Sequence, residues 1–276
     1  MSTISAKDVK KLRDMTGAGM MDCKKALTET GGDIEGAIEF LRKKGQKLAV
    51  KRVDREAKEG VVFALVSDDH KKGVVVRLSC ETDFVAKNED FLKFAKSIAD
   101  HALAQFKATK EELLATDFGG ITLNDKIIEQ LGVVGEKLEL ASYETIEAEM
   151  CVPYIHMGHR AGVVVGLNKA DDAFVAPGRD AAMQVAAMKP IAVDADGVSE
   201  ETKQKELEIG KELARNEGKP EAMLERISQG RLNKFFKENT LLNQSFVKDN
   251  KKTVGAYLKT FDKDLTVTEF KHVKLG

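Results

Sequence analysis

The stretch GVVVRLSCETDFVAKN at residues 73–88 joins a buried-strand pattern to the start of a helix. The apolar run at residues 74–78 is typical of a strand inside a sheet, and the apolar residues at 91–99 recur at helical spacing. Thr82 and Phe84 therefore lie at a strand-to-helix junction. Thr82 could cap this helix, and Phe84 could pack back on the sheet.

The second half of the chain repeats this pattern. Residues 162–167 (GVVVGL) echo residues 73–78 (GVVVRL), and residues 173–176 (AFVA) echo residues 83–86 (DFVA). Each copy leads into a helix with an apolar stripe, so we predict an α+β fold with two similar subdomains and antiparallel sheets. The acid of the first copy, Asp83, is replaced by alanine in the second. A shared fold explains the aromatic residue in both copies but not Asp83, which suggests a specific task for the first copy.

The first 45 residues are predicted to form three short helices around a small core. Ser5 and Asp8 have the spacing of a capping box at the start of the first helix, and Gly17 is expected to end it. Asp33 is expected to cap the third helix, which should stop before Gly45. These helices would form a small head at the N-terminus.

Residues 46–59 are rich in charge and nearly free of large apolar side chains, which indicates either a helix extension or a linker. We therefore place a domain boundary near Asp54. The predicted domains are the head with its linker at residues 1–54, a first core subdomain at residues 55–140 and a second core subdomain at residues 141–276. The second is expected to carry an inserted antiparallel helical hairpin at about residues 199–237, because two helical patterns with a thin apolar seam flank Gly-Lys-Pro there.

The composition argues against several classes of function. The chain has 276 residues with 44 Lys and Arg against 45 Asp and Glu, so net charge gives no case for direct nucleic-acid or membrane binding. Three widely spaced cysteines argue against a disulfide scaffold and for a reducing, cytoplasmic environment. No apolar window approaches the roughly 18 residues of a membrane span, and the N-terminus has no apolar signal core.

The sequence predicts no enzyme, no cofactor and no metal site. It contains no G-x-x-x-x-G-K-[ST] motif, so no phosphate-binding loop is expected. Cys151, His156 and His159 form the only metal-like cluster, but positions three apart on a strand point to opposite faces. A metalloenzyme built on these residues, or a ribosome- or RNA-associated module that uses the basic segment after Leu41, remains an alternative.

Three motifs resemble those of bacterial elongation factor Ts and occur in the order found in that family. They are TGAGMMDCKKAL at residues 16–27, TDFVAKN at residues 82–88 and YIHMGHRAGV at residues 154–163. The family is the guanine-nucleotide exchange factor of elongation factor Tu. The resemblance implies a ubiquitin-associated-like head, and it implies that the hairpin is the arm through which some members form homodimers. A self-contained hairpin is the alternative.

The resemblance also implies a partner-binding site without covalent chemistry. The residues implied to dislocate magnesium in GDP-bound elongation factor Tu, so that GDP leaves and GTP can rebind, are Thr82, Asp83, Phe84 and Val85. The residues implied to contact this partner elsewhere, with GDP bound or without nucleotide, are Arg13, Met20, Met21 and His156. The residues alone also allow structural roles: a capped helix for Arg13, core positions for the two methionines, and a hydrogen-bonded surface position for the histidine.

Overall fold

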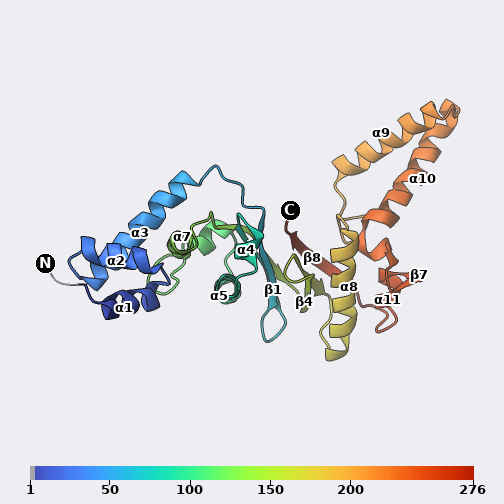
Figure 1. The fold of residues 1–276 in the computed structure, drawn as a ribbon. Helices are drawn as coiled ribbons and strands as arrows, with labels where there is room; N and C mark the ends of the chain where they lie inside the picture. The colour runs from blue at the N-terminus through green and yellow to red at the C-terminus, as the bar shows by residue number, and fades with distance from the viewer. Residues whose placement is uncertain (1–3) are drawn as a thin grey trace. The chain divides into compact units, whose positions relative to one another are not determined.

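The computed structural model describes residues 4–276 and divides into two compact units (Figure 1). Residues 1–3, at the start of the predicted head and N-terminal segment, lie outside the described residues. The first unit comprises the described residues up to Phe63, Val76–Glu144 and Lys274–Gly276, and the second comprises Ala64–Val75 and Thr145–Val273. Three N-terminal helices, antiparallel sheets and a helical hairpin are all present, so the predicted α+β fold class is confirmed.

The first unit contains the head and the helices around the Thr82 junction. Its helices are α1 (Ala6–Thr16), α2 (Met20–Glu29), α3 (Ile34–Lys51), α4 (Asp83–Ala86), α5 (Glu89–Gln105), α6 (Lys110–Leu114) and α7 (Leu123–Val134). The strands β1 (Glu59–Val66), β2 (Lys72–Cys80) and β3 (Glu139–Glu147) form a sheet in the order β1-β2-β3. Val62, Val76 and Leu78 of these strands are buried, as are Phe91 and Ile98 of α5.

The head helices bury a small core, as the sequence predicts. Ser5 and Asp8 form the predicted capping box, in which the Asp8 N–H donates to Oγ of Ser5 at 3.2 Å. Gly17 has a φ of 70°, in the left-handed region that glycine tolerates, and ends α1. Leu12 and Leu27 are fully buried, so the apolar stripes read from the sequence do face one another.

Helix α3 was expected to stop before Gly45. It instead continues to Lys51. A Cβ atom at position 45 would lie 2.8 Å from the carbonyl oxygen of Ile128 in α7, and one at position 132 would lie 3.1 Å from Cα of Gly45. The first distance is shorter than real Cβ contacts and the second is tighter than most of them, so the two helices cross backbone to backbone. The glycine that resembled a helix end serves a close helix contact, and residues 46–51 are a helix extension.

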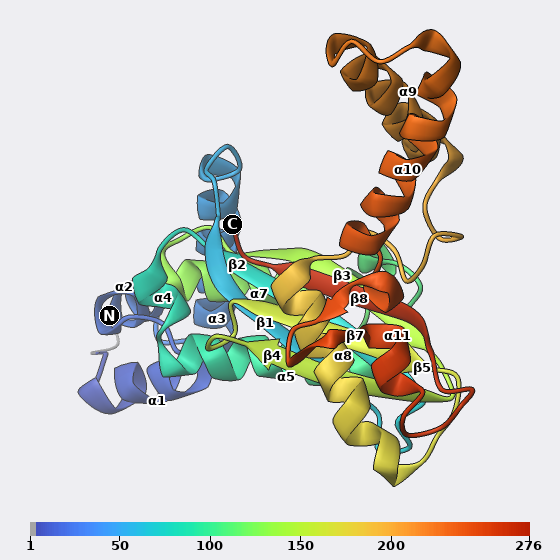
Figure 2. The same ribbon diagram turned by 90° about the vertical axis from the view of Figure 1, so that its right-hand side faces the viewer.

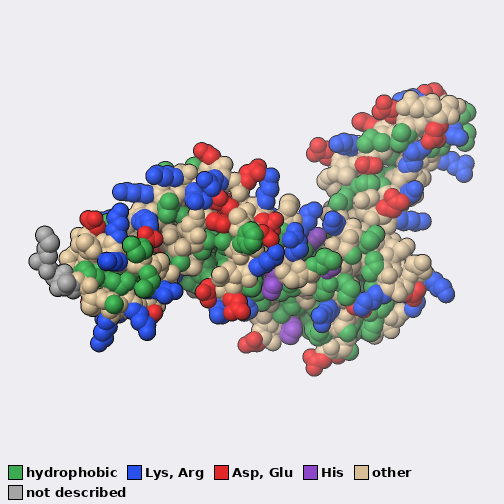
Figure 3. Space-filling view, viewed as in Figure 1, with side chains coloured by type: hydrophobic (Ala, Val, Ile, Leu, Met, Phe, Trp, Pro, Cys, Tyr) green, Lys and Arg blue, Asp and Glu red, His purple; other side chains and the backbone are tan. Residues whose placement is uncertain are grey.

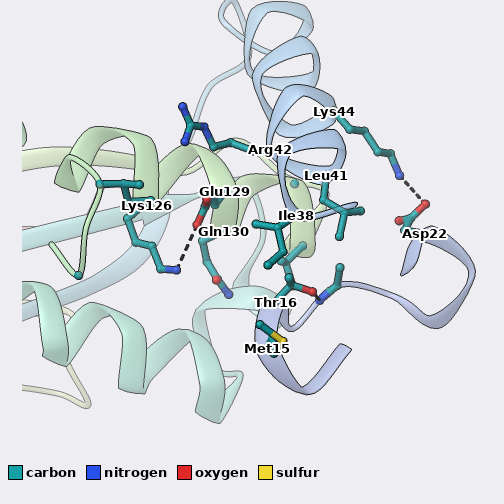
Figure 4. Close-up of a pocket in the computed structure, with 15 residues that line it drawn as sticks. Met15, Thr16, Asp22, Ile38, Leu41, Arg42, Lys44, Lys126, Glu129 and Gln130 are labelled. Atoms are coloured by element: carbon teal, nitrogen blue, oxygen red, sulfur yellow. Dashed lines mark hydrogen bonds and ion pairs between the residues drawn. The ribbon is translucent and has the colours of Figure 1, made fainter. Parts of the chain in front are cut away.

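Beside this crossing, the head and α7 enclose a cavity of about 270 Å³ (Figure 4). Met15, Ile38 and Leu41 line it from the head. Lys126 and Glu129 line it from α7, where they form an ion pair with each other at 3.1 Å. The contact between the head and α7 thus combines a close helix crossing with a cavity beside it.

The junction after β2 contains two helices instead of the single long helix that was expected. Asn88 interrupts the helical pattern between α4 and α5. Its Oδ1 accepts hydrogen bonds from the N–H groups of Asp90 at 2.8 Å and Phe91 at 3.2 Å, which caps α5. As a result, residues 83–86 form a separate single turn, and α5 carries the apolar stripe that packs into the core.

The second unit is built on strands β4 (Met150–His156), β5 (Ala161–Leu167) and β8 (Val267–Lys274), paired in the order β4-β5-β8. Its other elements are the 3₁₀ helix η1 (Asp172–Phe174), α8 (Val175–Met188), η2 (Leu241–Asn243), β6 (Ser245–Phe246), β7 (Asp249–Thr253) and α11 (Val254–Leu258). Strands β4 and β5 are antiparallel, with Val152 opposite Val165. Helix α8 packs against these two strands. Ala181 and Val185 share one apolar core with Val152, Val163 and Val165 of the strands.

Helices α9 (Glu200–Asn216) and α10 (Glu221–Asn239) form the predicted hairpin, which projects from the rest of the second unit (Figure 2). Ser199 caps α9, because its side chain accepts from the N–H of Thr202. A Cβ atom at Gly210 would lie 3.1 Å from Cα of Ser228, so the two helices approach closely there. Ile209 and Leu213 remain 39% and 44% exposed, which leaves apolar surface on the hairpin.

Candidate functional site

The single-turn helix α4 presents Phe84 to solvent. Its side chain is 83% exposed, so the expectation that it could pack back on the sheet is wrong. Lys87, one turn later, donates to the carboxylate of Asp83 at 2.6 Å and lowers the pKa of Asp83 further below its ordinary value of 3.8. In Figure 3 an apolar patch lies over α4 among acidic and basic side chains. An apolar ring and a carboxylate thus stand side by side on an exposed turn, which we call the tip (Thr82 to Val85).

Thr82 caps α4 as predicted and is itself held by a second residue. Its Oγ1 accepts from the N–H of Val85 at 3.4 Å. The N–H and Oγ1–H of Thr82 donate to the two carboxylate oxygens of Glu136 at 3.0 and 2.7 Å. The Sγ of buried Cys80 donates to the carbonyl oxygen of Thr82 at 3.2 Å. Thr82, the first residue of the tip, is therefore held through both its backbone and its side chain.

Glu81, directly before the tip, is the centre of a half-buried ion-pair cluster. Its side chain is 13% exposed, and its carboxylate accepts from Nη1 of Arg52 at 2.5 Å and from Nη1 of Arg55 at 2.9 Å. The backbone N–H of Lys137 donates to the same carboxylate at 2.6 Å. Burial alone would raise the pKa of Glu81, but the Lys137 N–H and the two guanidinium groups outweigh it and lower the pKa to about 2.

We expect Glu81→Gln to flatten the acid limb of the stability curve. Because its folded-state pKa lies below the ordinary 4.5, the ionised Glu81 stabilises the fold above pH 4.5, and that contribution is lost as the pH falls towards 2. Urea unfolding between pH 7 and pH 2 should give the variant a lower free energy of unfolding at pH 7 and a smaller loss below pH 4.5. Glu139→Gln, at a half-exposed glutamate, is the control. An unchanged slope in Glu81→Gln would contradict this role.

The repeated motif has opposite environments in its two copies. Phe174 is only 8% exposed and belongs to the apolar core of the second unit. Phe84, at the equivalent position of the first copy, is almost fully exposed. The repeat therefore does not explain Phe84 as a packing residue.

The predicted contact residues of the head are on its surface. Met20 and Met21, in the first turn of α2, are 54% and 76% exposed, so the alternative of core methionines is wrong. Arg13 lies in the last turn of α1 and is also exposed. The structure thus brings Thr82, Asp83, Phe84 and Val85 together on one turn, and it places Arg13, Met20 and Met21 on the head helices.

His156 ends strand β4 in the second unit, where it is partly buried. Its Nδ1 lies 3.0 Å from the hydroxyl of Tyr154, two residues earlier on the same face of the strand. The next residue, Met157, has a φ of 46° and a side chain that is 73% exposed. Sequence analysis missed Met157, although an apolar residue beside a turn glycine was a visible signal. The turn thus presents an apolar side chain next to the predicted contact histidine.

The metal-like cluster of the sequence has other roles here. The Sγ of Cys151 donates to the carbonyl oxygens of Lys71 at 3.4 Å and Ile146 at 3.8 Å, and burial raises the pKa of this thiol to about 11. Within residues 4–276, no group of three or more His, Cys, Asp and Glu side chains is arranged to hold a metal ion. All three cysteines are buried and unpaired.

Comparison with known proteins decides the family. The family model described as elongation factor TS matches residues 81–276. The chain belongs to the elongation factor Ts family. Proteins named elongation factor Ts from Christiangramia forsetii and Flavobacterium psychrophilum are 51% and 52% identical to it over 276 residues, with full coverage of both chains. The elongation factor Ts of Amoebophilus asiaticus is 54% identical over 275 residues, 99% of each chain.

The resemblance recognised in the three motifs is therefore confirmed, and membership of the elongation factor Ts family makes this chain a translation elongation factor. The match begins at Glu81, directly before the tip. Within residues 4–276, no helix is both long enough and apolar enough to cross a lipid bilayer.

Proposed function

We propose that this chain is the guanine-nucleotide exchange factor of elongation factor Tu and acts by binding alone, without covalent chemistry. It binds the GDP form, promotes loss of GDP and leaves a nucleotide-free complex to which GTP can bind. The observation that carries the proposal is the exposure of Phe84, beside an ionised Asp83, on a turn whose base is firmly held.

The tip has the physical properties that a wedge requires. Burying one phenylalanine side chain in a partner yields roughly 1.5–3 kcal/mol, and each tenfold gain in release rate requires about 1.4 kcal/mol. We propose that Phe84 enters beside the magnesium site of the GTPase while the Asp83 carboxylate disturbs the magnesium ligands and the phosphate loop. Thr82 and Val85 form the rest of the turn that carries these two side chains.

We propose that the head and the β4–β5 turn supply further binding energy. Exposed Met20 and Met21 offer apolar surface, and Arg13 offers a cation that is always charged. His156 and the neighbouring Met157 offer a second contact. This division of labour corresponds to the proposed domains, with a partner-binding head at residues 1–54 and core subdomains at residues 55–140 and 141–276.

The RNA-binding alternative rests on the basic side chains that gather over α3 in Figure 3. Several of these cations already have partners within the chain. Lys43 pairs with Glu39 at 2.8 Å and Lys44 pairs with Asp22 at 2.5 Å. Arg52 is engaged by Glu81. These ion pairs favour a solvated helix face, and salt-dependent retention on immobilised RNA would be needed to revive the alternative.

We expect the purified chain to form a complex with nucleotide-free elongation factor Tu that dissociates when GDP is added. Because coupling between two ligands is reciprocal, a factor that weakens GDP binding must itself be weakened by GDP. Size-exclusion chromatography with and without millimolar GDP measures this, and ADP serves as the control nucleotide. Co-elution that ignores GDP would contradict the proposed exchange function.

A further inference from the structure

Helix α4 cannot hold the tip in place by itself. It has four residues, of which only Ala86 is buried. A single helical turn is unstable in isolation, because few hydrogen bonds offset the cost of fixing its backbone. The direction in which Phe84 points must therefore be set from outside the turn.

Two short segments, residues 81–82 and residues 136–137, hold each other by hydrogen bonds and so anchor the tip. Glu136 accepts two hydrogen bonds from Thr82, and Glu81 accepts one from the N–H of Lys137. Each segment thus supplies one carboxylate that accepts hydrogen bonds from the other segment. Glu136 follows Gly135, which has a φ of 77° and ends α7. The position of the Glu136 carboxylate is therefore set by the end of a helix rather than by a free loop.

We propose that Glu136 is a positioning residue for the tip: its carboxylate fixes Thr82, and through Thr82 it aims Phe84 at the nucleotide site of the partner. The inference rests on the proposed exchange function. A carboxylate suits this role because each of its two oxygens accepts from a different Thr82 donor. A glutamine at this position would offer one acceptor oxygen and an NH₂ group that cannot accept the second bond.

The test separates positioning from binding. With full-length Glu136→Gln and Glu136→Ala, we expect the maximal rate of GDP release from elongation factor Tu to fall about tenfold or more, with a smaller loss in the glutamine variant. The factor concentration that gives the half-maximal rate should change less than about threefold, because the contacts of the head persist. Glu129→Ala, which removes a partly buried glutamate of α7 paired with Lys126, should leave both quantities unchanged.

A spectroscopic readout keeps the test decisive if a variant is unstable or if exchange is absent. In the free protein, the Thr82 N–H donates to Glu136 at 3.0 Å, so its exchange with deuterated solvent should be faster in Glu136→Ala than in the wild type. The melting temperatures of both variants are measured in parallel. A normal maximal release rate in a folded Glu136→Gln variant would overturn the inference, as would a Thr82 amide that exchanges equally slowly in the wild type and in folded Glu136→Ala. If the wild-type chain accelerates no release, the proposed function fails, and the exchange rate of the Thr82 amide alone decides whether Glu136 holds Thr82.

Discussion

Phe84→Ala and Asp83→Ala are expected to slow GDP release sharply while leaving the fold intact. Both side chains are on an exposed turn, so the free energy of unfolding should change by no more than about 0.5 kcal/mol. Loss of the roughly 1.5–3 kcal/mol from burying the ring in the partner corresponds to a release rate about ten- to a hundredfold lower for Phe84→Ala. Thermal melts and stopped-flow release of a fluorescent GDP analogue measure the two effects.

The internal repeat supplies the matched control for this experiment. Phe174 has the same position in the second copy but is buried in an apolar core. Phe174→Ala should therefore cost about 3–5 kcal/mol of stability, as large-to-small core substitutions do. Its release activity per folded molecule should be normal. If Phe84→Ala melts as early as Phe174→Ala and still releases GDP at the normal rate, the tip has been misplaced.

Gly60→Ala, in the strand beside the residues that lead to the tip, should be strongly destabilising. Gly60 in β1 has a φ of 136°, a conformation that residues with a side chain rarely adopt. A Cβ atom there would clash with the carbonyl oxygen of Leu78 and would lie 2.7 Å from Cα of Ser79. We expect a loss of about 2–6 kcal/mol, which combines about 1–3 for backbone strain with about 1–3 for overpacking. Urea unfolding measures it.

Gly119→Ala separates these two contributions. Gly119 also has a positive φ, 75°, but no atom lies within 4 Å of the Cβ position. Only the strain of the left-handed conformation should remain, about 1–2 kcal/mol. If both variants lose the same free energy of unfolding, β2 moves away from the new methyl group at no cost. The close approach of Gly60 to Leu78 and Ser79 would then contribute nothing to the loss.

Sequence patterns predicted the elements of this fold better than their ends. The repeated strand-to-helix motif and the apolar stripes of the head have direct counterparts in β2, β5 and α1–α3. Gly45 misled because local propensity favours a helix end at glycine, whereas here α7 lies against it. Asn88 was a readable cap that the longer apolar pattern concealed.

The exposure of the Phe84 side chain could not be predicted from the sequence. An apolar residue after a capping threonine has the same local pattern whether it is buried or exposed, as Phe174 and Phe84 demonstrate. The residues that hold Thr82 and Glu81 in place before Phe84 are Glu136 and Lys137, more than fifty residues away in the chain. Such long-range hydrogen bonds have no local periodicity from which to predict them.

An exposed phenylalanine also affects solubility. Apolar surface in contact with water promotes self-association, and proteins limit this by placing charged residues next to unavoidable apolar ones. Here the ionised Asp83 and the ammonium group of Lys87 flank a single ring. We therefore expect Asp83 and Lys87 to limit self-association of the chain through Phe84, in addition to any part they take in binding a partner.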